Sequence, residues 1–162
     1  MDEVDRIVAA WSRERPDLAV EPLQIVSRVR RLARHIERLR RNAFAAAGLE
    51  PWEFDVLSAL RRHGAPYEMS PTALVEETMV TSGTMTNRID RLAGRGFVER
   101  RTDATDRRVV RVAMTTRGRK HVDAAIETLL AAEQLVLDRL PQAERQGLED
   151  SLRKLGEGFT SP

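Results

Sequence analysis

The sequence predicts a mainly α-helical (α+β) fold in which a series of amphipathic helices is interrupted by one short β-hairpin. Two observations support this prediction. Apolar residues recur at helical spacing through most of the 162 residues. Segments 97–101 and 109–114 instead alternate between apolar and polar residues as strands do, and the intervening TDATDRR has turn chemistry.

A short helix, a turn and a second helix precede the hairpin. Ser70 is followed by a proline, which is a typical N-cap arrangement for the short helix. Ser82 is expected to cap the second helix, where Met85, Ile89 and Leu92 recur at 3.6-residue spacing. This order of elements predicts a winged helix-turn-helix, a fold that lays its second helix in the major groove of DNA.

Small polar and basic side chains occupy the outward face of these helices. Hydroxyl and amide groups near a helix N-terminus can reach base edges and phosphates without filling the groove. The residues expected to bind DNA here are Ser70, Thr81, Ser82, Thr84, Thr86, Asn87 and Arg91. The alternative is an ordinary solvated helix face, but the agreement of helix, hairpin and arginine placement favours DNA.

Charge is unevenly distributed along the chain. The formal net charge is only +2, yet residues 81–120 hold eleven basic against four acidic residues, and residues 121–162 hold four against eight. A basic region of this kind indicates a polyanionic partner. The bias toward arginine suits phosphate, which the guanidinium group can bind with two hydrogen bonds.

Several other chemistries find no support in the sequence. The absence of cysteine excludes disulfides and thiolate metal sites, and the three histidines, His35, His63 and His121, lack metal-ligand spacing. There is no glycine-rich phosphate loop, and no segment approaches membrane-spanning length. We therefore expect a soluble cytoplasmic protein without cofactor, metal or membrane contact.

The flanking helices predict self-association. They are expected at residues 2–14, 21–47, 51–62, 116–140 and 142–156. Within a single domain of residues 1–162, segments 1–47 and 117–162 would then flank a DNA-binding lobe at 48–116. Their apolar stripes exceed what this lobe can cover, so a homodimer is the simplest way to bury them. Such a dimer would place two recognition helices about 34 Å apart.

Three segments together resemble the MarR family, the multiple-antibiotic-resistance type of bacterial transcriptional regulators. They are residues 81–92, residues 96–100 and the wing at 103–118 with its Asp-Arg-Arg tip. The resemblance covers nearly the whole chain and implies a homodimer, acting as a repressor, on a pseudo-palindromic operator. It also implies that Arg107 and Arg108 lie at the wing tip, where one of them reaches a narrow minor groove.

A narrower resemblance concerns the urate-responsive branch of that family. It rests on Trp11, Asp55, Arg62, Arg88 and Arg100, and implies an anionic ligand between the dimer helices and the DNA-binding lobe. Similar constellations respond to tricarboxylates and aromatic acids, so the prediction is a small anionic effector rather than urate itself. Asp55 lies among apolar residues, where a carboxylate is rarely buried unless paired. The alternative is therefore a fixed Asp55–Arg100 ion pair with Trp11 as ordinary core.

The sequence also bears on two other classes of function. An enzyme would need an acid or nucleophile to complement Asp55, and none is evident, so we expect no catalytic activity. An architectural or activating DNA-binding protein would show the same DNA-binding helices but would not respond to an effector.

Overall fold

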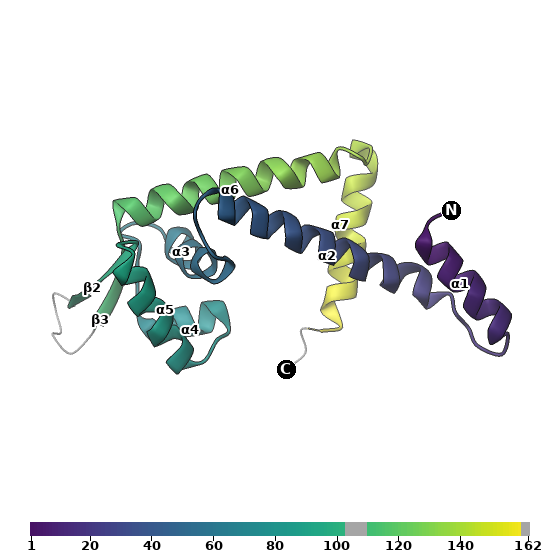
Figure 1. Cartoon of the computed structure of the whole chain (residues 1–162), viewed down its shortest axis with the longest axis horizontal. Helices are drawn as coiled ribbons and strands as arrows, with labels where there is room; N and C mark the ends of the chain where they lie inside the picture. The colour runs from purple at the N-terminus through teal and green to yellow at the C-terminus, as the bar shows by residue number, and fades with distance from the viewer. Residues whose placement is uncertain (103–109, 160–162) are drawn as a thin grey trace. The chain divides into compact units, whose positions relative to one another are not determined.

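The computed structural model describes residues 1–102 and 110–159, which form two compact units, Met1–Asn42 and Ala43–Pro162. The elements are α1 (Glu3–Glu14), α2 (Pro22–Ala46), α3 (Pro51–His63), β1 (Glu68–Met69), α4 (Pro71–Thr78), α5 (Ser82–Gly94), β2 (Val98–Thr102), β3 (Val110–Met114), α6 (Thr116–Leu137) and α7 (Gln142–Glu157) (Figure 1). Within the described residues, no helix has both the length and the apolarity that a membrane crossing requires.

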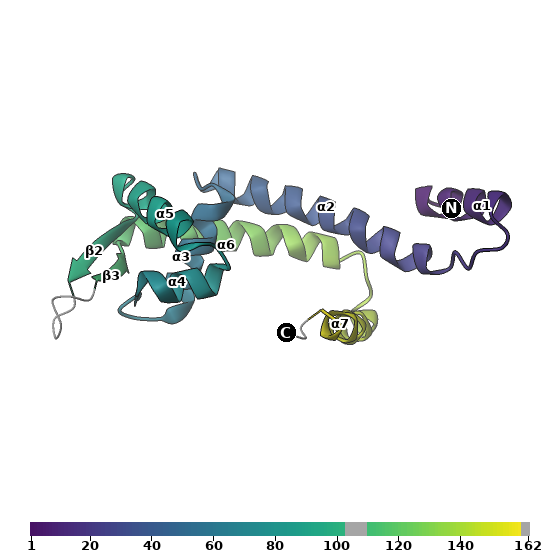
Figure 2. The same ribbon diagram turned by 90° about the horizontal axis from the view of Figure 1, so that it is seen from below.

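The second unit is a winged helix-turn-helix, as the sequence predicted. In both views α3, α4 and α5 lie side by side, and the β2–β3 hairpin extends beyond them (Figures 1 and 2). The helices pack on one another, and α6 packs on α3. Their shared core includes Phe54 and Leu60 together with the predicted positions Met85, Ile89 and Leu92, all of which are buried.

The sheet has three strands rather than the two that we expected. Its antiparallel order is β1-β3-β2, with Val98 opposite Met114 and Glu68 opposite Ala113. The third strand, β1, forms because β3 supplies a free edge, and two residues are too few to show alternation in the sequence.

Two predicted helix ends need correction. Thr81, not Ser82, is the N-cap of α5, because it has the extended backbone of a cap and its Oγ1 accepts the N–H of Thr84 at 3.3 Å. Helix α6 ends at Leu137 rather than near Leu140. The proline at 141 disfavours a helical backbone at the residue before it, so a turn separates α6 from α7.

Two sets of apolar side chains remain exposed. In the first unit they lie on α2, where Ile25 and Val26 are 61% and 63% exposed. In the second unit they lie on α6 and α7, where Leu135 and Leu152 are 71% and 48% exposed. Helix α7 contains no buried residue at all. These faces are those that the sequence predicted to need a partner.

Glycine is required at the start of α6. A Cβ added at Gly118 would lie 2.2 Å from the carbonyl oxygen of Phe97 and 3.2 Å from Cγ of Met114. Phe97 is fully buried, and its carbonyl oxygen already accepts the N–H of Thr115. Only a residue without a side chain therefore lets α6 begin this close to the hairpin.

We expect Gly118→Ala to destabilise the protein. Alanine favours a helix over glycine by about 1 kcal/mol, but moving α6 away from Phe97 should cost about 1–3 kcal/mol. The matched control is Gly147→Ala on α7, where a Cβ meets nothing within 4 Å. Urea unfolding measures both variants, and equal stability of the two would contradict the close approach.

In the first unit, α1 is held by its cap and by ion pairs to α2. Asp2 and Asp5 cap each other's backbone N–H groups at 2.9 and 2.7 Å. Arg28 donates to Asp5 at 2.6 Å and to Asp2 at 2.9 Å, and Arg31 pairs with Glu3. A helix of twelve residues is too short to be stable alone, so these contacts help to hold it.

The three carboxyl groups titrate below their ordinary range. The pKa of Asp2 is lowered mainly by the backbone N–H of Asp5, and the pKa of Asp5 by the backbone N–H of Asp2, with Arg28 adding to both. The hydrogen bond from Arg31 lowers the pKa of Glu3. All three groups therefore favour the docked helix when they are ionised.

We expect acid to release α1 from α2. Because the folded pKa values are the lower ones, their stabilisation is complete above the unfolded values at about pH 4 and is lost as the pH falls through the folded values. In a Trp52→Phe background, the fluorescence of Trp11 should report this transition. Arg28→Gln should move it to higher pH and Arg30→Gln should not; equal midpoints in both variants would refute the assignment.

Candidate nucleic-acid interface

Helix α5 has one buried and one open face. Met85, Ile89 and Leu92 are at most 1% exposed and fix the inner face in the core. The outer face carries the exposed residues Thr81, Ser82, Thr84, Thr86, Asn87 and Arg91. The structure thus brings together six of the predicted DNA-binding residues, and their role remains a prediction.

The start of this face is well ordered. Oγ1 of Thr81 lies 2.9 Å from Oγ1 of Thr84, and the hydroxyl of Thr86 donates to the carbonyl oxygen of Ser82 at 3.1 Å. The N-terminus of a helix carries partial positive charge and attracts phosphate. Small hydroxyls around it leave room for a close approach of a nucleic-acid backbone.

The remaining predicted DNA-binding residues lie elsewhere. Ser70 is half-buried and caps α4 by accepting the N–H of Ala73 at 3.1 Å, so its side chain already has a structural function. Arg107 and Arg108, expected at the wing tip, lie outside the described residues. The base of the wing is held by Arg101, which donates to Glu68 at 2.6 Å.

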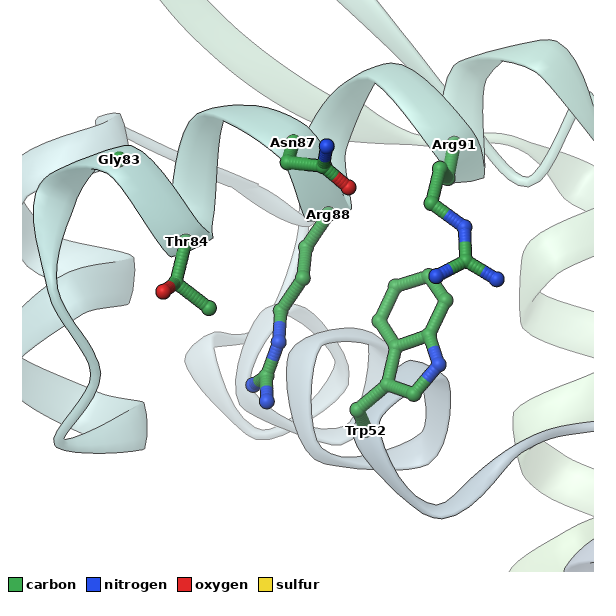
Figure 3. Close-up of a pocket in the computed structure, with 6 residues that line it drawn as sticks. All are labelled: Trp52, Gly83, Thr84, Asn87, Arg88 and Arg91. Atoms are coloured by element: carbon green, nitrogen blue, oxygen red, sulfur yellow. The ribbon is translucent and has the colours of Figure 1, made fainter.

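An open pocket of about 470 Å³ adjoins the outer face of α5. It is lined by Trp52, Gly83, Thr84, Asn87, Arg88 and Arg91. Figure 3 shows Arg88 and Arg91 reaching from α5 toward the indole of Trp52 on α3. The guanidinium carbon lies 4.7 Å from the ring centroid for Arg91 and 5.8 Å for Arg88.

Sequence reasoning did not find Trp52. It lies in the first turn of α3, more than thirty residues before the arginines that it meets. A tryptophan beside a proline at a helix start is a common core anchor, and it is indeed packed partly against the core. Only the packing of α3 on α5 reveals that its remaining face meets two guanidinium groups.

The C-terminal end of α5 is tied to α3 by a buried carboxylate. Glu53 is 1% exposed and is the one charged residue in the buried set of the described chain. It pairs with Arg95, the C-cap of α5, and accepts the N–H of Glu50 at 2.9 Å. The other end of the Arg95 guanidinium donates to the carbonyl oxygen of Gly48 at 2.8 Å. The α2–α3 turn, α3 and α5 are thereby joined at one point.

This arrangement corrects the expectation for Asp55. We predicted that Asp55 would lie among apolar residues, but it is exposed, and Glu53 takes the buried position instead. The reason is helical phase, because the buried side of α3 passes through residues 53, 54, 56, 57 and 60 and leaves 55 outside.

Two other residues of the predicted effector site pair with carboxylates. Arg100 pairs with Asp90 at 2.7 Å. Arg62 is exposed and lies 3.4 Å from Glu77.

Trp11, also predicted for this site, belongs to the first unit and is 49% exposed. Among the five predicted effector residues, Arg88 is the one that lines the pocket beside Trp52.

Comparisons with known sequences agree on one family. A sequence model of the MarR family matches residues 47–109. The HTH-type transcriptional regulator PecS of Dickeya dadantii (strain 3937) is 35% identical over 153 residues, which are 94% of this chain and 92% of PecS. The HTH-type transcriptional repressor YetL of Bacillus subtilis (strain 168) is 30% identical over 92 residues, covering 57% of this chain and 54% of YetL.

Solved structures share the fold. A MarR family protein from Bacillus stearothermophilus has a TM-score of 0.73 at 23% identity, over 85% of this chain and 94% of its own. A mutant of MarR from E. coli, complexed with operator DNA, has a TM-score of 0.66 at 25% identity, over 84% of this chain and 94% of its own.

We expect Arg91→Ala to weaken binding to every duplex sequence. If Arg91 contacts a phosphate, its loss should lower the slope of log K against log salt by about 0.9. Arg153→Ala on α7 removes the same charge away from α5 and is the control. Fluorescence anisotropy with a labelled duplex at several salt concentrations measures both slopes, and an unchanged slope for Arg91→Ala would contradict the assignment of this face.

Proposed function

The chain belongs to the MarR family of DNA-binding transcriptional regulators, and on this basis we propose that it is a homodimeric repressor released from a pseudo-palindromic operator by a small anionic ligand. The observation that carries the proposal is the outer face of α5, on which hydroxyl, amide and guanidinium groups are exposed together. Its relatives are regulators of transcription, so the chain is a regulator and not an enzyme.

In the proposed complex, α5 enters the major groove. Thr84 and Asn87 would reach base edges, and Arg91 would contact phosphate. Arg107 and Arg108 at the wing would contact the adjacent minor groove, where narrow A·T-rich DNA attracts arginine. The action as a repressor is proposed by analogy with YetL, which carries that name.

The proposed dimer accounts for the exposed apolar faces. Ile25 and Val26 on α2, together with Leu135 on α6 and Leu152 on α7, present apolar area to water in the isolated chain. Burying such area yields about 25 cal/mol per Å². A second copy offers the same faces about a two-fold axis, which also pairs the two α5 helices for two half-sites.

The proposed effector is a small anion that contacts Trp11, Asp55, Arg62, Arg88 and Arg100 in the assembled dimer. Support comes from the half-buried Arg88, which shares the indole face of Trp52 with a second guanidinium and so leaves excess positive charge in the pocket. An anion bound there would compete with phosphate for α5. Ligand and DNA would then weaken each other's binding by the same factor.

A combined binding and release experiment tests this function. Duplexes selected from a random pool by the purified protein should show two half-sites about 10 base pairs apart, and ultracentrifugation should show a dimer. Urate, aconitate, citrate and aromatic acids are then screened by thermal shift, because a ligand of the folded state raises the melting temperature. A compound that does so should also release the selected duplex.

Variants separate the proposed DNA binding by a dimer from the proposed release by an anion. Trp11→Ala should blunt the response to the anion while duplex affinity without ligand stays unchanged. A monomer that binds no duplex would overturn the proposal as a whole. Stable binding that no anion relieves would instead favour a ligand-independent architectural or activating protein.

A further inference from the structure

We propose that Trp52 is a positioning residue for duplex binding, because its indole face holds the guanidinium of Arg91, and more loosely that of Arg88, at the groove face of α5. The inference rests on the proposed function and adds a residue of α3 to it. Both guanidinium carbons, at 4.7 and 5.8 Å from the ring centroid, lie within the range of a cation–π interaction.

The arginines near the end of α5 fall into two groups. Arg95 is paired with Glu53 and Arg100 with Asp90, so a carboxylate neutralises each of them. Within the described part of the chain, neither Arg88 nor Arg91 forms an ion pair. An aromatic face can hold a guanidinium group without cancelling its charge, and a carboxylate cannot. Trp52 therefore orders two cations that keep their full attraction for phosphate.

The indole of Trp52 is held in place by its surroundings. Trp52 packs partly against the hydrophobic core, and its neighbour Glu53 ties the same turn of α3 to the C-cap of α5. Because one turn of α3 contacts α5 through both residues, the indole cannot move far from the helix that carries Arg91. An exposed arginine normally loses several rotamers when it binds a ligand. Contact with the ring restricts these rotamers before DNA binds, so less conformational entropy is lost on binding. It also leaves N–H donors free at the edge of the guanidinium group.

The pocket geometry agrees with this function. Thr84 and Asn87 line the same pocket as the two arginines and belong to the outer face of α5 (Figure 3). The stacked guanidinium groups therefore sit beside polar groups that are proposed to reach the bases. A phosphate at the rim of the pocket would meet Arg91 in an orientation that Trp52 has already selected.

The test compares Trp52→Leu with Trp52→Phe and, as a control at an exposed aromatic residue, with Phe159→Leu, all without effector. Trp52→Leu should weaken duplex binding about two- to fivefold at low salt, as expected for an exposed cation–π contact, and should also lower the salt slope. Tryptophan carries no charge, so a merely structural loss would leave that slope unchanged. Trp52→Phe should retain most of the affinity, and Phe159→Leu should keep the wild-type salt slope.

A double-mutant cycle isolates the interaction between Trp52 and Arg91. In an Arg91→Ala background, Trp52→Leu should have a smaller effect than in the wild type, because the two residues act through one contact. Equal effects in both backgrounds, with an unchanged salt slope, would overturn the inference and leave the proposed DNA binding intact. If Arg91→Ala itself has the wild-type salt slope, the assignment of the outer face of α5 to DNA binding is wrong instead.

Fluorescence keeps the inference testable if Trp52→Leu does not fold. The chain has two tryptophans, so Trp11→Phe leaves Trp52 as the sole emitter. Saturation of this variant with duplex should change its emission, since phosphate binding alters the charge stacked on the indole. Emission that is unaltered at full duplex saturation would contradict the positioning of Arg91 by Trp52.

Discussion

The buried carboxylate of Glu53 is the contact on which the orientation of α5 depends. A carboxylate at 1% exposure is costly unless it is paired, and here Arg95 and a backbone N–H satisfy it. Because Arg95 also donates to the carbonyl oxygen of Gly48, one guanidinium joins the α2–α3 turn, α3 and the end of α5. At its other end, α5 is held by the burial of Met85 in the core, and Thr81 caps its first turn. A helix held at both ends presents its outer face in one orientation, which suits a surface that must match a rigid groove.

The charge available for DNA differs from the charge counted along the sequence. Residues 81–120 carry a clear basic surplus, but carboxylates from outside this segment reduce it. Glu53 on α3 neutralises Arg95, and Glu68 on β1 pairs with Arg101. Arg88 and Arg91, which lie over the neutral indole of Trp52, keep their charge. Proximity in the sequence therefore overestimates the positive charge that this region offers to DNA.

Sequence periodicity was enough to predict every helix, both strands of the hairpin and the buried positions Met85, Ile89 and Leu92, because these features depend on local spacing. The polar outer face of α5 followed from the same periodicity. The features that the sequence did not predict depend on tertiary contacts. Strand β1 exists only because β3 offers an edge, and Trp52 meets its arginines only after α3 packs on α5. At about 100° per residue, Glu53 and Asp55 lie on opposite sides of α3, so helical phase decides which acid is buried. The pairing of Glu53 with Arg95 depends instead on the packing of α3 against α5.

The apolar faces that remain open give the proposed switch its physical basis. Helix α7 has sixteen residues and no buried one, and most of the stability of a helix in a protein comes from the packing of its apolar face. A partner that covers α7 and the apolar side of α6 would therefore fix the positions of both α5 helices from a distance. In such a dimer, a ligand needs no contact with the DNA bases to weaken binding. It needs only to bind better to an arrangement whose half-site spacing differs from that of the operator, and its effect cannot exceed its difference in affinity between the two arrangements.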